Sequence, residues 1–400
     1  MRVVITPSVA KGVVTAPPSK SVTHRALICG ALSTRSTIRN VAYSQDIEAT
    51  LRCLEAMGAF VKRQGDVVQI GGLNPFSIQP YTRLDCGESG STLRFLLPLC
   101  LLSSVPIVLT GSQRLLERPL DVYEQLCRAR KLTWIQTDNG ITVCGPLTAG
   151  SYSVAGNISS QFISGLLFAL SLLESESSLE VTAPFESKSY VRMTRSVLSQ
   201  FGVKVSDSNQ IFSVGGKAVY RSKEYMVEGD CSNAAFLEGL NLLGGEVAVR
   251  GLSSETTQGD RVYQAFFQRL REGRSAYDLT DCPDLGPVMF ALAAALDGAA
   301  FTGTARLRIK ESDRVATMVQ ELAKFGAQTS VTDNEVVVHG GELRKPTDVL
   351  CGHNDHRVVM ALSLLCSKVG GVIDGAEAVA KSYPNFFAVL RGLGIEVNEQ

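Results

Sequence analysis

The sequence contains clusters of cations, hydroxyls and carboxylates that could bind an anion and move protons on it. Lys20 and Arg25 flank the hydroxyl of Ser21, and Lys310, Glu311 and Arg314 form a second, denser cluster; each cluster precedes or opens a helix-like stretch. Cations and the backbone N–H groups of a helix start bind anions together. Neighbouring acids can donate or accept protons. The residue types and spacing therefore predict a site for a multiply charged anionic substrate.

Further candidates follow the same pattern of polar groups directly before an apolar run. Asp281 and Asp284 precede residues 288–296, and Asn354, Asp355, His356 and Arg357 precede residues 358–366. The other candidates are Gly90, Arg118, Ser159, Ser160, Gln161, Ser187, Tyr190 and Lys381.

Each cluster also has a purely structural interpretation. Ser19 alone would cap a helix, and Gly87 with Gly90 suits a tight turn as well as a ligand-binding loop. Acids around Asp284 would stabilise a helix dipole. A solvated face is the usual outcome for a charge run such as 310–314, but repetition of the pattern along the chain favours a site.

The helices that must position these residues recur along the chain. Six copies begin at residues 19, 87, 159, 230, 284 and 354, with separations of 54 to 72 residues. The apolar runs that follow include residues 26–32, 93–102, 162–173, 234–243, 288–296 and 358–366. A similar loop chemistry at near-regular spacing predicts six copies of one supersecondary unit.

A second repeat runs in step with the first. Gly58, Gly202, Gly326 and Gly394 stand where an amphipathic helix pattern passes into a strand pattern, as expected for glycine at a helix end. Hairpins follow, with second strands that end on glycine in residues 67–72, 211–216 and 335–341. Each copy is therefore predicted to contain two helices and a hairpin, with another strand between the helices.

Length and composition indicate more than one domain. The chain has 400 residues, of which 45% are hydrophobic, enough for more than one core. Three copies lie before about residue 228 and three after it. Crossovers near residues 16–19 and 225–229 would join the two domains through a hinge with a cleft.

Composition also excludes several classes of protein. The formal net charge is zero, without a basic run that would favour nucleic acid, and the apolar stretches are too short to span a membrane. The N-terminal residues lack the features of a targeting signal. The ten cysteines contain no Cys-x-x-Cys pair, which indicates reduced thiols in the cytoplasm. No histidine–cysteine cluster has zinc spacing, so we expect no metal and no cofactor.

In their order along the chain, these motifs resemble those of the 5-enolpyruvylshikimate-3-phosphate (EPSP) synthases, a family of enolpyruvyl transferases. The resemblance covers nearly the whole length. It rests on Pro-Ser-Lys-Ser-x-x-x-Arg at 18–25, Gly-x-x-Gly at 87–90, Glu-Arg-Pro at 117–119, Ser-Ser-Gln at 159–161, Glu-Gly-Asp at 228–230, Pro-Asp at 283–284, Lys-Glu-Ser-Asp-Arg at 310–314, Asn-Asp-His-Arg at 354–357 and Lys-Ser-Tyr-Pro at 381–384.

The resemblance implies a two-domain, inside-out α/β barrel with six βαβαββ repeats, three in each domain, and two hinge crossovers. Residues 1–16 plus 229–400 would carry the acid–base and phosphoenolpyruvate-binding residues, and residues 17–228 would bind mainly 3-phosphoshikimate. The implied reaction transfers the enolpyruvyl group of phosphoenolpyruvate to the 5-hydroxyl of 3-phosphoshikimate, through a tetrahedral intermediate, with release of phosphate. A monomer acting on these small molecules alone is the family expectation.

The resemblance also implies residue roles. Asp284, assisted by Lys310, would take the proton of the attacking hydroxyl, Glu311 would protonate the methylene carbon, and Lys20 would be the fourth catalytic residue. The residues implied for 3-phosphoshikimate are Lys20, Ser21, Arg25, Ser159, Ser160, Gln161, Ser187, Tyr190, Asp284 and Lys310. Those implied for phosphoenolpyruvate are Lys20, Gly90, Arg118, Gln161, Arg314, Arg357 and Lys381.

Three positions depart from the family pattern: Glu88 and Arg306 stand where asparagine is usual, and Phe95 where proline is usual. They put the affinity for phosphoenolpyruvate and the sensitivity to inhibitors in doubt.

Two other interpretations remain. A related transferase acts on a UDP-amino sugar and carries a cysteine on its mobile loop, whereas residues 111–117 here contain none. A catalytically inactive anion-binding module would have the same fold, but Lys20, Asp284 and Glu311 argue against it.

Overall fold

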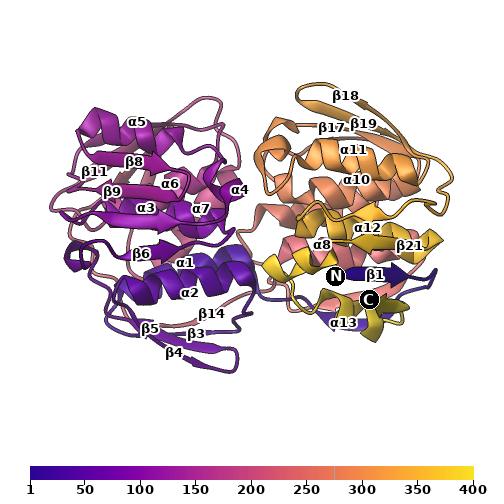
Figure 1. The fold of residues 1–400 in the computed structure, drawn as a ribbon, viewed down its shortest axis with the longest axis horizontal. Helices are drawn as coiled ribbons and strands as arrows, with labels where there is room; N and C mark the ends of the chain where they lie inside the picture. Colours follow the sequence, from indigo (N-terminus) through magenta and orange to yellow (C-terminus); the bar gives the residue numbers. More distant parts are fainter. Residues whose placement is uncertain (274) are drawn as a thin grey trace. The chain divides into compact units, whose positions relative to one another are not determined.

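In a computed structural model that describes residues 1–273 and 275–400, the chain folds into two compact units. Unit 1 comprises Met1–Pro17 and Gly229–Gln400, and unit 2 comprises Pro18–Glu228. Figure 1 shows both units as mixtures of helices and strands. Each unit has its own hydrophobic core.

Unit 2 contains three four-stranded sheets with one common topology. Their strand orders are β14(Glu224–Met226)-β3(Ser36–Arg39)-β5(Val67–Gly71)-β4(Phe60–Gln64), β6(Arg83–Asp85)-β7(Ile107–Thr110)-β9(Gly140–Cys144)-β8(Thr133–Thr137) and β10(Ser151–Ala155)-β11(Ser177–Thr182)-β13(Ile211–Val214)-β12(Val205–Ser208). In every sheet the first two strands are parallel and the remaining pairs antiparallel. A parallel pair needs a crossover helix, which is the βαβ part of the predicted repeat.

The apolar helices of unit 2 lie inside and its sheets outside. The inner helices are α1(Lys20–Leu32), α3(Gly90–Cys100) and α6(Ser160–Leu170), which are buried over most of their length. The others are α2(Gln45–Ala56), α4(Gln113–Leu116), α5(Asp121–Arg130), α7(Lys188–Gln200) and the short η1(Pro75–Ser77). The hairpin strands β4, β8 and β12 are mostly exposed. A helix that is apolar on all sides must be covered on all sides, so the sequence itself requires this arrangement.

Unit 1 is built in the same way. Its sheets are β16(Ser275–Asp278)-β17(Gly298–Thr302)-β19(Glu335–His339)-β18(Gln328–Val331), β20(Leu350–Cys351)-β21(Gly371–Asp374)-β1(Arg2–Ile5)-β22(Val397–Glu399) and the two-stranded β15(Glu246–Arg250)-β2(Lys11–Thr15). Its helices are α8(Cys231–Gly239), α9(Tyr263–Arg271), α10(Gly286–Ala295), α11(Arg314–Lys324), α12(His356–Val369) and α13(Phe386–Gly392), and its short helices are η2(Leu240–Leu243), η3(Gly259–Val262), η4(Pro283–Leu285), η5(Ala305–Ile309) and η6(Ala376–Lys381). Helices α8, α10 and α12 pack together and are almost entirely buried (Figure 1).

Two repeats of unit 1 differ from the others in the strands that form their sheets. Strand β1 lies between β21 and β22, so the N-terminal residues complete the last repeat of unit 1. The repeat that begins at Asp230 has a sheet of two described strands, β15 and β2, instead of four. The shorter separation of 54 residues from this copy to the next reflects the missing hairpin.

The four glycines predicted to end helices all have left-handed backbones. The φ angles are +103° at Gly58, +87° at Gly202, and +86° at both Gly326 and Gly394. Side chains with a Cβ rarely adopt this region, so these positions turn each helix sharply into the following strand.

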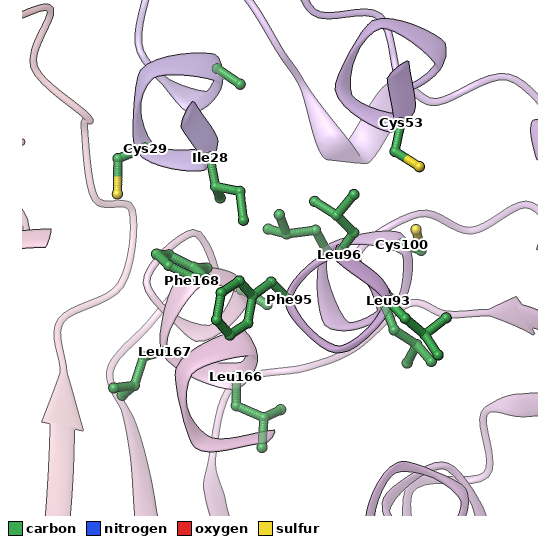
Figure 2. Close-up of a cluster of buried hydrophobic side chains, with 14 of the residues drawn as sticks. Ile28, Cys29, Cys53, Leu93, Phe95, Leu96, Cys100, Leu166, Leu167 and Phe168 are labelled. Carbon is green, nitrogen blue, oxygen red and sulfur yellow. The ribbon is translucent and has the colours of Figure 1, made fainter. Parts of the chain in front are cut away.

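Phe95 is a residue of α3, and its side chain packs against α6 in the core of unit 2. Its ring is fully buried and makes an edge contact with Phe168, with ring centroids 5.7 Å apart. Figure 2 shows these two rings next to each other, with Ile28 of α1 and Leu166 of α6 nearby. The Phe95 ring also lies 4.9 Å from the guanidinium carbon of Arg25. The departure from the family's usual proline is thus a large core side chain in contact with a predicted substrate-binding cation.

We predict that Phe95→Ala lowers the free energy of unfolding of unit 2 by about 3–5 kcal/mol, because it leaves a cavity in a packed core. Trp134 is the only tryptophan and lies in β8 of unit 2, so its fluorescence in a urea titration follows this unit. Phe76→Ala, at a side chain that is 49% exposed, is the matched control and should change little. Equal losses in the two variants would contradict the assignment of Phe95 to the core.

Candidate active site

Most of the predicted polar clusters begin a helix and cap it. The side chains of Ser19, Ser89 and Ser159 accept hydrogen bonds from the first backbone N–H groups of α1, α3 and α6. Asp230 and Asp355 do the same for α8 and α12. The capping interpretation therefore holds at five of the six starts, and the remaining side chains of each cluster are the candidates for ligand binding.

Asp284 differs because its side chain does not cap a helix. It lies in the short helix η4, and α10 begins at Gly286 without a side-chain cap. The Asp284 carboxylate instead contacts three cations: Arg314 Nη1 at 2.9 Å, Lys310 Nζ at 3.4 Å and Arg357 Nη2 at 3.5 Å. Four residues predicted as site residues thus meet at one carboxylate.

These contacts determine the charge state of Asp284. Burial opposes its ionisation, but Lys310, Arg357 and Arg314 outweigh burial and hold the pKa of Asp284 well below its ordinary value. Burial also lowers the pKa of Lys310, and the negative charge of Asp284 raises it by a smaller amount. Arg306, one of the departures from the family pattern, is a nearby cation that lowers this pKa further. The carboxylate is therefore charged, and the lysine beside it is more easily deprotonated than an exposed one.

Arg314 binds three carboxylates at once. Its side chain is 1% exposed and contacts Asp284, Glu311 through Nη2 at 2.8 Å, and Asp355 through Nε at 2.9 Å. Asp355 and the other two acids raise the pKa of Arg314 although burial lowers it. Arg314 therefore fixes the relative positions of Asp284 and Glu311, the two predicted acid–base residues.

Arg357 and Lys381 lie beside this cluster. Arg357 Nη1 donates to Asn233 Oδ1 at 3.4 Å, and its buried Nε has no hydrogen-bond partner among the described residues. Lys381 Nζ donates to the carbonyl of Asn354 at 2.6 Å, next to the Asp355 cap. Unit 1 therefore gathers all of its predicted site residues around the starts of α10, α11 and α12.

In unit 2 the predicted Lys20 makes an ion pair with Asp46. Lys20 Nζ lies 2.7 Å from Asp46 Oδ2, and both side chains are nearly buried. His24, one turn further along α1 than Lys20, contacts Thr50 Oγ1 through Nδ1 at 2.8 Å, and Thr50 Oγ1 contacts Thr92 Oγ1 at 2.6 Å. Burial holds the pKa of His24 well below its ordinary value, so this histidine is a neutral part of the core.

Arg25 is held by groups on α1 and α7. It donates to Thr194 Oγ1 at 2.7 Å, to the carbonyl of Ser21 at 2.7 Å and to the carbonyl of Tyr190 at 3.2 Å. Burial lowers the pKa of Arg25 to about 10, which leaves it charged at neutral pH. The structure thus brings Tyr190 next to Arg25, which is 165 residues away in the sequence.

A second group in unit 2 joins Gly90, Arg118 and Gln161. Arg94 Nη1 donates to Gln161 Oε1 at 2.9 Å and Arg94 Nη2 to the carbonyl of Pro119 at 2.9 Å, next to Arg118. A Cβ at Gly90 would lie 2.8 Å from Arg118 Nη1, so only glycine permits this close approach. The buried Nε of Arg118 has no partner among the described residues.

The predicted phosphate-binding hydroxyls lie at the starts of two helices. Ser159 and Ser160 begin α6, and Ser187 precedes α7 with a left-handed φ of +52°. Helices α6 and α7 pack against each other. The role of these three serines as a phosphate site stays a prediction.

Several residues of these groups were given no role from the sequence. Asp355 belonged to a recognised motif, but nothing local signals that it would reach across to Arg314. Asp46 and Arg94 meet their partners 26 and 67 residues away in sequence. Asp260 has no motif at all. Such residues emerge from packing between repeats, which spacing alone does not reveal.

Asp260 is a further buried acid beside the Asp284 cluster. It is fully buried, and Ser232 at the start of α8 donates a hydrogen bond to it. Burial and then the charge of Asp284 raise its pKa to about 7, although Ser232 and Arg357 oppose the shift. Asp260 therefore gains a proton in the pH range in which most carboxyl groups are ionised.

Comparisons with known proteins identify the family of this chain. The family model described as EPSP synthase (3-phosphoshikimate 1-carboxyvinyltransferase) matches residues 4–390. The chain belongs to this family of enolpyruvyl transferases.

Among its relatives is the 3-phosphoshikimate 1-carboxyvinyltransferase of Clostridium kluyveri, which is 40% identical over 99% of this chain and 98% of its own. That of Clostridium acetobutylicum is 36% identical with the same coverage. The fold resembles EPSP synthase from Acinetobacter baumannii, with a TM-score of 0.79, 23% identity and full coverage of both chains. The predicted fold class is thereby confirmed.

We predict that Asp260→Asn changes how stability depends on pH. The folded chain keeps a proton on Asp260 up to about pH 7, whereas an unfolded chain releases it near pH 3.8, so wild-type stability falls as the pH rises through this window. The amide cannot ionise, so the variant should gain of the order of 1–4 kcal/mol over wild type between pH 4 and 8.

Urea unfolding followed by circular dichroism at pH 5 and pH 8 measures this difference. Asp374→Asn is the control, because Arg2 lowers the pKa of this exposed acid. Asp374 is therefore ionised in both the folded and the unfolded chain between pH 5 and pH 8, and its substitution should add no pH dependence there. A stability difference between Asp260→Asn and wild type that is independent of pH would contradict the prediction.

Proposed function

We propose that this chain is a 3-phosphoshikimate 1-carboxyvinyltransferase, which transfers the enolpyruvyl group of phosphoenolpyruvate to the 5-hydroxyl of 3-phosphoshikimate and releases phosphate. One observation carries the proposal beyond family membership: the Asp284 carboxylate lies among Lys310, Arg314 and Arg357, with Glu311 on the same guanidinium. This arrangement combines a base, an acid and cations for an anionic substrate.

In the first step, Asp284 accepts the proton of the 5-hydroxyl group of 3-phosphoshikimate. The oxygen of that hydroxyl group attacks C2 of phosphoenolpyruvate at the same time. Three cations hold the pKa of Asp284 low, which makes it a weak base in the free enzyme. The phosphate and carboxylate of phosphoenolpyruvate add negative charge beside the same cations. This charge raises the basicity of Asp284 when both substrates are bound, so base strength depends on substrate occupancy.

In the same addition, Glu311 delivers a proton to the methylene carbon, and a tetrahedral intermediate results. The Glu311 carboxylate then takes a proton back from the methyl carbon, and phosphate leaves with the proton held on Asp284. This step restores the carbon–carbon double bond and the starting states of both residues. The contact of Arg314 with both Asp284 and Glu311 holds the two groups at a fixed separation, as proton transfer at two different atoms requires.

We assign substrate binding to the remaining predicted residues. Unit 2 contributes Lys20, Ser21, Arg25, Ser159, Ser160, Gln161, Ser187 and Tyr190 to 3-phosphoshikimate, and Lys20, Gly90, Arg118 and Gln161 to phosphoenolpyruvate. Unit 1 contributes Asp284 and Lys310 to 3-phosphoshikimate, and Arg314, Arg357 and Lys381 to phosphoenolpyruvate. The Nε atoms of Arg118 and Arg357 are buried and have no hydrogen-bond partner within residues 1–273 and 275–400, which supports their roles as donors to an anion.

We also propose that the enzyme works as a monomer in the cytoplasm, on small molecules and without a nucleic-acid partner. Zero formal net charge and ten free thiols support this proposal. Among the described residues, no helix is both long and apolar enough to cross a membrane. Sedimentation equilibrium checks the monomer.

We predict that phosphate release requires both phosphoenolpyruvate and 3-phosphoshikimate, and that Asp284→Ala lowers kcat about 10²–10⁴-fold, because the general base is lost. The assay follows inorganic phosphate with each substrate alone and with both. Asp374→Ala, at an exposed acid of the same unit, is the control and should retain activity. An absence of enolpyruvyl product from the wild type at saturating substrates would contradict the function, and full activity of Asp284→Ala would contradict the base.

A further inference from the structure

Glu321 is a buried acid in α11 that the reaction described above does not use. It lies beyond the Asp284 cluster, seven residues after Arg314 on the same helix, and its side chain has no exposed surface. Burying a carboxylate is costly unless donors surround it, so its partners indicate what it holds.

Two of those partners belong to the segment 351–354, which leads into α12. Glu321 Oε2 accepts from the backbone N–H of Cys351 at 3.0 Å, and Oε1 lies 2.9 Å from His353 Nε2. Lys324 Nζ contacts both carboxylate oxygens, at 3.0 and 2.9 Å. Burial raises the pKa of Glu321, but His353, Lys324 and Cys351 outweigh this effect and lower it. The carboxylate is therefore ionised and binds three donors.

The segment that Glu321 contacts has an unusual backbone. His353 and Asn354 are left-handed, with φ angles of +48° and +52°. Residues with a Cβ hold such conformations only where neighbouring contacts fix them. Three contacts fix this one: Glu321 to His353, the Gly352 N–H to the carbonyl of Asp374 at 2.7 Å, and Lys381 to the carbonyl of Asn354.

The residues that follow carry the phosphoenolpyruvate cations of unit 1. Asp355 caps α12 and binds Arg314 through both of its oxygens. Arg357 is the second residue of that helix, and Lys381 reaches the Asn354 carbonyl. A change in the backbone at His353 and Asn354 therefore moves the partners of Arg314 and Lys381 and the helix start that carries Arg357.

We propose that Glu321 is a positioning residue for phosphoenolpyruvate binding, because it fixes the left-handed segment 351–354 and thereby aligns Arg314, Arg357 and Lys381. This inference rests on the proposed function for its kinetic consequence. The residues assigned to 3-phosphoshikimate lie mostly in unit 2, so the two substrates respond differently to the loss of Glu321.

The test is Glu321→Gln. The amide has only one acceptor oxygen and no charge, so it cannot accept from both Cys351 and His353 and loses the ionic contacts with Lys324 and His353. We expect the KM for phosphoenolpyruvate to rise on the order of 10- to 100-fold, while the KM for 3-phosphoshikimate stays within about twofold. Backbone amide exchange in residues 351–357 should accelerate.

Two companion variants separate positioning from stability. His353→Ala removes the imidazole contact and should reproduce the effect on phosphoenolpyruvate. Lys324→Met removes the ammonium partner of Glu321 but leaves the contacts with Cys351 and His353, so it should leave both KM values unchanged even if unfolding stability falls.

The proposal is overturned if Glu321→Gln leaves the KM for phosphoenolpyruvate unchanged, or if both KM values rise equally. If the wild type gives no turnover, the proposed function fails, and equilibrium binding of phosphoenolpyruvate together with amide exchange decides the role of Glu321. Unchanged binding and exchange in Glu321→Gln would then overturn it.

Discussion

The shared guanidinium of Arg314 is the interaction on which the candidate site depends. A charge that is 1% exposed is stable only when its partners are fixed and complete. Three carboxylates from three different helix starts supply those partners, so the geometry of α10, α11 and α12 is tied to one side chain. The same contacts leave Asp284 charged and place Glu311 at a fixed distance from it.

The inside-out architecture makes this arrangement possible. Helices that are apolar on all sides are covered by sheets, so their N-terminal ends are the parts that carry polar side chains. Four of the repeats end a helix at a left-handed glycine and return through a strand, which brings the next helix start to an equivalent place. A repeated unit therefore produces several polar helix starts in each unit from local rules.

The sequence predicted the features that local chemistry determines. Capping residues before apolar runs marked the helix starts, and glycines marked the helix ends, since both act within a few residues. The pairing of Lys20 with Asp46, the bridge from Arg94 to Gln161 and the reach of Asp355 to Arg314 were not predicted, because they depend on packing between repeats. The shorter repeat after Asp230 was visible as a spacing, but only the structure shows that a hairpin is missing.

The position of β1 between β21 and β22 has a consequence for biosynthesis. Unit 2 is one continuous stretch of chain and has all of its strands once Glu228 has left the ribosome. Unit 1 combines Met1–Pro17 with Gly229–Gln400, so its β1-containing sheet is not complete until Val397–Glu399 are made. Strand β1 must therefore wait for its sheet partners until Gly371–Asp374 and then Val397–Glu399 have been made, and an unpaired strand edge is prone to association. Folding of the two units is thus ordered in time by chain topology, with the unit that carries Asp284 and Glu311 completed last.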